Sequence, residues 1–253
     1  MHETPDVPAT EALASALLTA HFPVILTGQR LGEEGSIELA SREEWASRAN
    51  LEAALTEPER FWEYFYPLGR EVGERRPNAG HVAIARLQQA GLVSGLITQA
   101  VDRLHQKAQS TDVVEVYGTL IIVTCTRCGE RYGLPEVGRL LELAPDGVPR
   151  CTIDGCAFPL RPEGTLWNEP LPAAAVSRAW ELAGQADLLI VFDSPLRTVP
   201  ISLLPSVPLT RGAKLVMVGS VPTQYDRYAA LVSRENSVEL LTALVDLVCP
   251  APA

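Results

Sequence analysis

Apolar residues in this chain come in short continuous runs, separated by longer segments in which apolar residues recur at helical spacing. Continuous runs of Leu, Ile, Val and Phe are typical of strands that are buried on both faces of a sheet. The runs cover residues 22–26, 95–98, 113–116, 187–192 and 214–218, and the expected helices cover residues 11–20, 77–92, 173–182 and 237–248. Strands that alternate with helices predict an α/β fold with a parallel sheet and helices on both faces.

The segment from residue 95 to residue 119 places polar side chains directly after a buried run. Gln99, Asp102 and His105 follow the run that ends at Thr98, and the apolar spacing within residues 99–110 predicts a helix. In open parallel sheets, ligands bind outside the carboxyl ends of the strands. We therefore expect these three side chains to crowd at a functional site, with Tyr117 at its far end.

A glycine-bearing turn, Gly28-Gln29-Arg30 with Gly32, follows the first predicted strand. Glycine lets a backbone approach a phosphate group, so this turn is a candidate nucleotide site. A plain strand-to-loop turn explains the same residues equally well. The segment alone leaves both interpretations open.

Residues 42–72 carry most of the aromatic side chains among good helix formers. We expect helices over residues 42–55 and 57–72, broken at Pro58 and Pro67. The aromatic residues are Trp45, Phe61, Trp62, Tyr64, Phe65 and Tyr66. Such a cluster is typical of a small helical core, with a cofactor-binding box as the alternative. His81, near the start of the next helix, is expected to cap or to pack.

Length and charge narrow the classes of function. The chain has 253 residues, 47% of them apolar, which is enough for one large domain with a smaller module. It carries 21 basic and 31 acidic residues, a net charge of −10. A surface of that sign repels phosphate backbones, so we expect no nucleic-acid partner, whereas basic peptides are attracted. The sequence shows no signal-peptide pattern and no apolar stretch of membrane-spanning length, so we expect a cytoplasmic protein with no membrane partner.

Four of the five cysteines form two closely spaced pairs, Cys125-x-x-Cys128 and Cys151-x4-Cys156. Two such pairs separated by a loop can supply four thiolates to one tetrahedral zinc ion. A redox dithiol needs only one pair, and two disulfides do not suit an intracellular setting. We therefore expect a structural zinc ion with no open coordination position, and no role for Cys249.

Taken in order, several motifs resemble those of the sirtuins, a family of NAD-dependent protein deacylases. The motifs are Glu57-Pro58-x-x-Phe61-Trp62, Pro77-Asn78-Ala79-Gly80-His81, Thr98-Gln99-x-Val101-Asp102-x-Leu104-His105-Gln106, the four-cysteine module and Glu169-Pro170-Leu171-Pro172. The similarity runs from residue 22 to residue 247. It implies a Rossmann-type large domain, a zinc-bearing small domain, and a cleft between them for NAD and an acyl-lysine peptide.

The aromatic and cysteine segments lie between predicted strands of the sheet, so we interpret them as insertions. Residues 1–38, 81–121 and 161–253 then form the Rossmann-type large domain. The small domain combines a helical insertion, residues 39–80, with a zinc module, residues 122–160. The mouth between the two domains is the expected pocket.

The departures from the family pattern all fall where the resemblance places the cofactor. Gly28-Gln29-Arg30 replaces Gly-Ala-Gly, Leu39-Ala40-Ser41 replaces Asp-Phe-Arg, and Asp193-Ser194-Pro195 replaces a Gly-Thr-Ser phosphate loop. Ala100 and Gly219 each replace an asparagine, the second of which holds the adenosine ribose. The cofactor-binding positions that the resemblance implies are Gly28, Gln29, Arg30, Gln99, Asp102, Asp193, Ser194 and Thr223.

Tyr117 stands where the family has the histidine that accepts a proton from the nicotinamide ribose. Imidazole titrates at about 6.5 and a phenol at about 10, so a tyrosine is a poor base at neutral pH. Losing a general base costs roughly two to four orders of magnitude in rate. We hypothesise a protein that has lost deacylation and binds a protein partner or an NAD- or ADP-ribose-type ligand. The alternatives are an enzyme, deacylase or ADP-ribosyltransferase, that uses Tyr117, Asp102 or water as the base, and a structural protein with a collapsed cleft.

Two further features leave alternatives open. Arg30 and Asp193 map to the loops that flank the diphosphate in the family, where they either form an internal ion pair or stay apart, Arg30 in solvent and Asp193 capping a helix. Trp167 and Glu169 map to the family's acyl-lysine channel. Trp167 either clasps an aliphatic stem or packs in the core.

Overall fold

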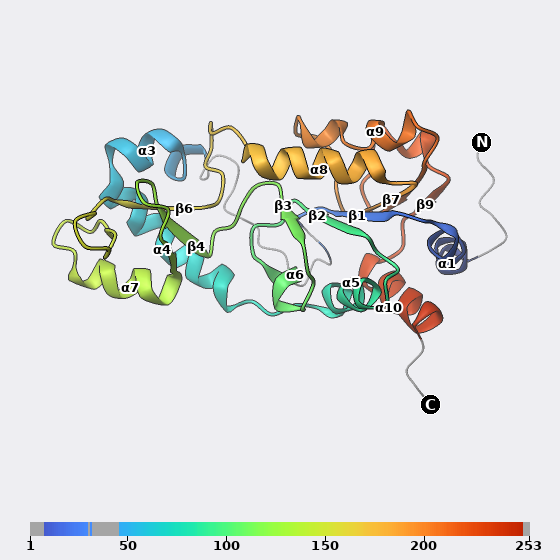
Figure 1. The fold of residues 1–253 in the computed structure, drawn as a ribbon, viewed down its shortest axis with the longest axis horizontal. Coiled ribbons are helices and arrows are strands. Elements are labelled where there is room, and N and C mark those ends of the chain that lie inside the picture. Colours follow the sequence, from blue (N-terminus) through green and yellow to red (C-terminus); the bar gives the residue numbers. More distant parts are fainter. Residues whose placement is uncertain (1–7, 30, 32–45, 250–253) are drawn as a thin grey trace.

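A parallel six-stranded sheet organises the protein. The computed structural model describes residues 8–29, 31 and 46–249. Its strands are β1 (Pro23–Thr27), β2 (Gly95–Thr98), β3 (Val113–Glu115), β7 (Leu188–Phe192), β8 (Lys214–Val218) and β9 (Leu231–Ser233). Their order is β3-β2-β1-β7-β8-β9 (Figure 1). The parallel sheet predicted from the apolar runs is confirmed, and β9 is a strand that those runs did not predict.

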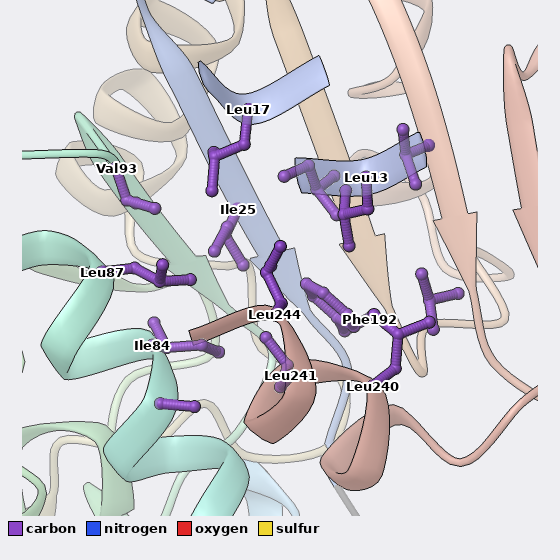
Figure 2. Close-up of a cluster of buried hydrophobic side chains, with 14 of the residues drawn as sticks. Leu13, Leu17, Ile25, Ile84, Leu87, Val93, Phe192, Leu240, Leu241 and Leu244 are labelled. Atoms are coloured by element: carbon purple, nitrogen blue, oxygen red, sulfur yellow. The ribbon is translucent and has the colours of Figure 1, made fainter. Parts of the chain in front are cut away.

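Helices cover both faces of this sheet. On one face lie α1 (Ala9–Thr19), α5 (Ala79–Gln89) and α10 (Ser237–Val248), and on the other lie α8 (Ala173–Gln185) and α9 (Ser206–Leu209). Within β1, Ile25 packs on the first face and Val24 and Leu26 on the second, because successive side chains of a strand point to opposite faces. Figure 2 shows the leucines of α1 and α10 around Ile25. Each fully buried leucine contributes about 1.5–3 kcal/mol, so both layers stabilise the sheet.

A second, smaller sheet lies at the opposite end of the molecule from α1 and α10 (Figure 1). It is antiparallel, in the order β5-β4-β6, with β4 at Ile122–Cys125, β5 at Arg131–Gly133 and β6 at Leu160–Pro162. Around it lie α3 (Leu51–Thr56), α4 (Pro58–Glu74) and α7 (Leu134–Leu143). Buried Phe61, Trp62 and Phe65 of α4 form its centre, with the rings of Phe61 and Phe65 stacked 5.4 Å apart. These aromatic residues are therefore a small core, as expected, while the residue limits of the two domains stay a prediction.

The expected break at Pro67 is wrong, because α4 runs through it without interruption. A proline inside a helix removes one backbone hydrogen bond. Phe61, Trp62 and Phe65 before Pro67 and Val72 after it are buried in the core of the small sheet, and this packing holds the helix together across Pro67. The helix expected over residues 42–55 is interrupted: residues 46–48 are helical, residues 49 and 50 are not, and residues 42–45 lie outside the described residues. α3 begins at Leu51, after Asn50 caps it by accepting a hydrogen bond from the amide of Ala53, and Trp45 lies outside the described residues.

The helix expected over residues 99–110 is reduced to one turn, α6 (Leu104–Lys107). Side chains compete here for the backbone amides that a helix would use. The Thr98 hydroxyl accepts from the amide of Ala100, and the Asp102 carboxylate accepts from the amide of Leu104. Arg103 between them has a φ of 58°, which no right-handed helix tolerates. The apolar spacing in this segment reflects loop residues that pack inward.

None of the helices in the described ranges is both long enough and apolar enough to cross a lipid bilayer.

Candidate functional site

Side chains from three loops meet at the carboxyl edge of the large sheet. Gln99 follows β2 directly and is 6% exposed. The hydroxyl of Ser194, in the loop after β7, donates to its Oε1 atom at 2.5 Å. The phenol of Tyr117 lies near the side chains of Gln99 and Thr198, both of which act on its pKa. The structure thus brings together Gln99, Tyr117 and Ser194, and adds Thr198, which the sequence did not single out.

Tyr117 lies between the core of the large sheet and that of the small one. Burial raises the pKa of its phenol above the ordinary value, and this effect outweighs the opposing influence of the Thr198 and Gln99 side chains. The phenol is therefore neutral across the physiological pH range. It can donate and accept hydrogen bonds here, but it is a weaker base than imidazole.

Asp102 lies close by but is occupied by its own loop. It is 5% exposed, and its Oδ1 atom accepts from the amide of Leu104 at 3.0 Å. Burial raises the pKa of this carboxyl group, despite that hydrogen bond and the charges of Lys107 and Arg75. Its geometry is that of a residue that shapes the loop after β2.

His105 lies beneath the same loop and packs on His81, with ring centroids 4.7 Å apart. Its Nε2 atom lies 3.0 Å from the hydroxyl of Thr27, which donates to Thr98, so Nε2 is the protonated nitrogen. His81 forms a capping box with Asn78 at the start of α5, which confirms the capping interpretation. Burial lowers the pKa of His81 to about 4 and, together with the His81 ring, lowers that of His105 well below its ordinary value. Both rings are buried, and whether His105 joins Gln99 and Asp102 at a functional site stays a prediction.

Gly28, Asp193 and Gly219 pack directly against one another where β1, β7 and β8 end. The amide of Gly28 bonds the carbonyl of Phe192, and a Cβ at Gly28 would overlap the carbonyl oxygen of Asp193. Asp193 has a φ of 51°, and Gly219 has a φ of 146°. Gln29 is exposed, and Arg30 lies outside the described residues, so the ion pair between Arg30 and Asp193 stays a prediction.

A cavity of about 430 Å³ opens beside Asp193, between the ends of β7 and β8 and the start of α10. Ser194, Gly219 and Thr223 line it, as do two arginines that the sequence did not reveal, Arg197 and Arg234. Arg234 donates to the carbonyl of Gly219 at 2.8 Å and forms an ion pair with Asp226. Asp226 also accepts from the amide and the hydroxyl of Thr223, so this hydroxyl is already engaged.

The charges around this cavity bear on whether a nucleotide fits. Asp193 alone would repel a diphosphate, as would Glu235. Arg197 and Arg234 line the same cavity and offset the two carboxylates in part, since Arg234 is itself paired with Asp226, and the cavity volume lies in the range of small-molecule pockets. Arg234 follows β9, a strand of three residues that was too short to predict, which is why its place at the cavity was missed.

Trp167 and Glu169 lie in the loop before α8. Trp167 is half-buried, and its backbone pairs with that of Ala49 and Leu51. Glu169 forms a two-point ion pair with Arg161, at 2.6 and 2.7 Å. Burial acts to raise the pKa of Glu169, but the hydrogen bonds and charge of Arg161 and the amide of Leu166 together lower it. Glu169 therefore fixes this loop, and whether Trp167 lines a channel stays a prediction.

The four paired cysteines converge on one point beside β4 and β5. Their Sγ atoms all lie within 4.8 Å of one another. The nearest pairs cross the two motifs, with Cys125–Cys156 at 3.6 Å and Cys128–Cys151 at 3.5 Å. A tetrahedral zinc with Zn–S bonds of about 2.3 Å requires S···S separations of about 3.8 Å. The donor set therefore fits a structural zinc ion, held by all four thiolates with no position left for a substrate.

Comparison with known proteins identifies the family. Residues 33–200 match the Sir2 family. The chain belongs to the sirtuin, or Sir2, family. This sirtuin is 34% identical to the NAD-dependent protein deacetylase 1 of Geobacillus kaustophilus over 241 residues, which are 92% of this chain and 96% of that protein. It also resembles the structure of Sir2Tm bound to a propionylated peptide, with a TM-score of 0.83, 30% identity, and coverage of 95% of this chain and 98% of that one.

One further structural relative bears on the cleft of this sirtuin. It is a histidine-to-tyrosine mutant of Sir2 with a p53 peptide and NAD. The TM-score is 0.80 at 30% identity, and the match covers 94% of this chain and 98% of that one. The family and the fold implied by the motifs are thus confirmed.

Proposed function

We propose that this sirtuin binds a peptide and an NAD- or ADP-ribose-type ligand but has lost efficient deacylation. The observation that carries the proposal is the half-buried Tyr117 phenol, whose pKa burial raises further above neutrality. A general base works best when its pKa lies near the working pH. Tyr117 therefore leaves the ribose without an efficient proton acceptor, at a cost of roughly two to four orders of magnitude in rate.

Retention of binding is supported by the histidine-to-tyrosine mutant of Sir2. That protein carries the same exchange of residue types that the motif resemblance assigns to Tyr117, and its structure holds both a p53 peptide and NAD. A phenol is therefore compatible with both ligands in a sirtuin fold. In this chain, Gln99, Ser194, Arg197 and Arg234 are the groups that would contact the nucleotide.

Bound NAD supplies the activated ribose that an acyl oxygen attacks and nicotinamide as the leaving group. The role of this chain's own residues is then to hold the ligand. Gln99 and Ser194 offer a fixed amide and hydroxyl, and Gly28 lets the backbone after β1 lie close to Asp193. A basic acyl-lysine peptide suits the net charge of −10.

A peptide assay separates loss of chemistry from loss of binding. We expect purified wild-type protein, given NAD and an acyl-lysine peptide, to release no nicotinamide above background. Calorimetry should still detect binding of ADP-ribose. Tyr117→His should raise nicotinamide release without reaching the rate of a typical sirtuin, since Ala100 and Asp193 remain, and Tyr117→Phe should match wild type. Failure of ADP-ribose and of the peptide to bind at all would leave only a structural protein.

The second candidate is a working deacylase or ADP-ribosyltransferase. It is favoured by the 34% identity to a deacetylase along 92% of the chain. In that case the wild-type protein consumes NAD above background, and Tyr117→Phe abolishes this activity where the phenol is the base but not where Asp102 or water is. Equal, near-background rates for the two proteins support the first candidate.

A further inference from the structure

Two sulfur atoms of the zinc module accept hydrogen bonds of different kinds, one from a backbone amide and one from a side chain. Cys125 accepts from the backbone amide of Arg127 at 3.4 Å. Cys151 instead receives the hydroxyl of Tyr132, at 3.1 Å. Backbone donors survive any substitution of their residue other than proline. The contact at Cys151 depends on one particular side chain.

The surroundings of Tyr132 direct its proton to the sulfur atom. The ring is 2% exposed and packs within the core of the small sheet. Its oxygen accepts from the amide of Thr152 at 2.9 Å and lies 3.3 Å from the hydroxyl of Thr152. A phenol has one proton and two acceptor sites. With Thr152 using the acceptor sites, the proton is left for Cys151.

The position of Tyr132 also bridges the two halves of the module. It stands on β5, just after the first cysteine pair, and holds Cys151 and Thr152 of the second. The second pair encloses four residues where the first encloses two, so its loop loses more conformational entropy when it is ordered. Fixing Thr152 in place reduces the part of that cost that zinc binding must offset.

We propose that Tyr132 is a positioning residue of the zinc site, which sets how firmly the ion is held by donating to the Cys151 thiolate and ordering the second cysteine loop. Donors to a metal ligand fix its orientation and take up part of its negative charge. Loss of such a partner typically weakens metal binding about 10- to 100-fold. The proposal rests on zinc occupying the four-cysteine site.

The test compares Tyr132→Phe with a matched variant, Tyr225→Phe. Tyr225 is also a buried phenol with a hydrogen bond, to the carbonyl of Ser202 at 2.9 Å, but it packs in the core of the large sheet. Zinc affinity is measured by competition with a chelator of known affinity. We expect a loss of about tenfold or more for Tyr132→Phe and none for Tyr225→Phe.

Substitution of cobalt(II) for zinc allows a spectroscopic measurement that a change in packing alone would leave unaltered. Removing a donor leaves more electron density on the Cys151 thiolate, so the sulfur-to-cobalt charge-transfer band of Tyr132→Phe should shift to lower energy. Unchanged affinity together with an unchanged band overturns the proposal, as does an equal loss of affinity in Tyr225→Phe. Wild-type protein that takes up no zinc or cobalt overturns the metal site itself, whereas metal uptake without nicotinamide release leaves both proposals standing.

Discussion

The carboxylate of Asp193 fills the space beside Gly219, with its Oδ1 atom 2.9 Å from the point that a Cβ on Gly219 would occupy. The two positions are therefore coupled. An aspartate at 193 is compatible with a glycine at 219, and any larger residue at 219 would displace the carboxylate. These are two of the positions at which the sequence departs from the family pattern, and the contact explains why they depart together.

The first prediction tests this coupling. Gly219→Asn should lower the free energy of unfolding by about 1–3 kcal/mol, because the new side chain meets Asp193 and the φ of 146° suits only glycine. Adding Asp193→Gly should recover part of that loss, since glycine accepts the φ of 51° at position 193. Urea denaturation of the wild type, the single variants and the double variant gives the interaction free energy between positions 193 and 219. Ser220→Asn, on the exposed neighbour, is the control and should change little, and strictly additive effects would refute the coupling.

The second prediction concerns acid stability and the pair of His81 and His105. Both have a folded-state pKa below the unfolded value of about 6.5, so the unfolded chain binds more protons once the pH falls below 6.5. Their contribution to stability is complete above that pH and declines toward pH 4, by roughly 1.4 kcal/mol per pH unit for each histidine. His81→Gln removes one titrating group and keeps a side chain that completes a capping box. As the pH falls from 6.5 toward 4, the wild type should therefore lose stability relative to His81→Gln by roughly 1.4 kcal/mol per pH unit.

The third prediction concerns Glu115, whose contribution to stability is lost as the pH rises rather than as it falls. Burial is the main cause that raises its pKa to about 7, partly offset by Arg103 and by a hydrogen bond with Gln106. The folded protein then holds a proton that the unfolded chain releases above about pH 4.5. Its contribution to stability is complete below that pH and is lost as the pH rises toward 7. Glu115→Gln should make the protein relatively more stable at pH 8 than at pH 5, and a pH-independent effect in thermal melts would contradict the assignment.

The sequence predicted the large sheet well because its strands are buried on both faces. The runs at residues 214–218 and 237–248 coincide with β8 and α10, since continuous burial and a capping Asn236 mark their ends. The segment after β2 was misread because its apolar residues have helical spacing, although Thr98 and Asp102 take the amides that a helix needs. Periodicity does not reveal that competition.

The candidate site was predictable only where a motif is local. The four cysteines could be found from their spacing alone, whereas Arg197 and Arg234 reach one cavity from loops that are 37 positions apart. The bond from Tyr132 to Cys151 also depends on how β5 lies against the second cysteine loop. Such contacts depend on tertiary packing, which cannot be predicted from residue types and spacing alone.

The fourth prediction concerns ligand charge at the cavity beside Asp193. Arg197→Met should weaken ADP-ribose binding about threefold, because an exposed ion pair contributes up to roughly 1 kcal/mol. The loss should shrink at high salt, which screens the charge. Arg178→Met is the control, since Arg178 lies on α8 beside a different cavity and pairs with Glu181. Calorimetry at two salt concentrations measures both, and equal losses in the two variants would exclude a specific contact.

The fifth prediction is that removing zinc unfolds the small sheet and spares the large one. β4 and the loops between β4 and β6 carry the thiolates, and without the ion four sulfur atoms within 4.8 Å lose their common partner. Zinc binding in such modules is a large part of their folding free energy. The large sheet has its own core of leucines from α1, α5 and α10, which holds no metal ligand. After chelation, hydrogen exchange should accelerate by roughly an order of magnitude or more in β4, β5 and β6, with little change in β1, β7 and β8. Added zinc should restore protection, and uniform loss of protection across both sheets would show that the two cores fold as one unit.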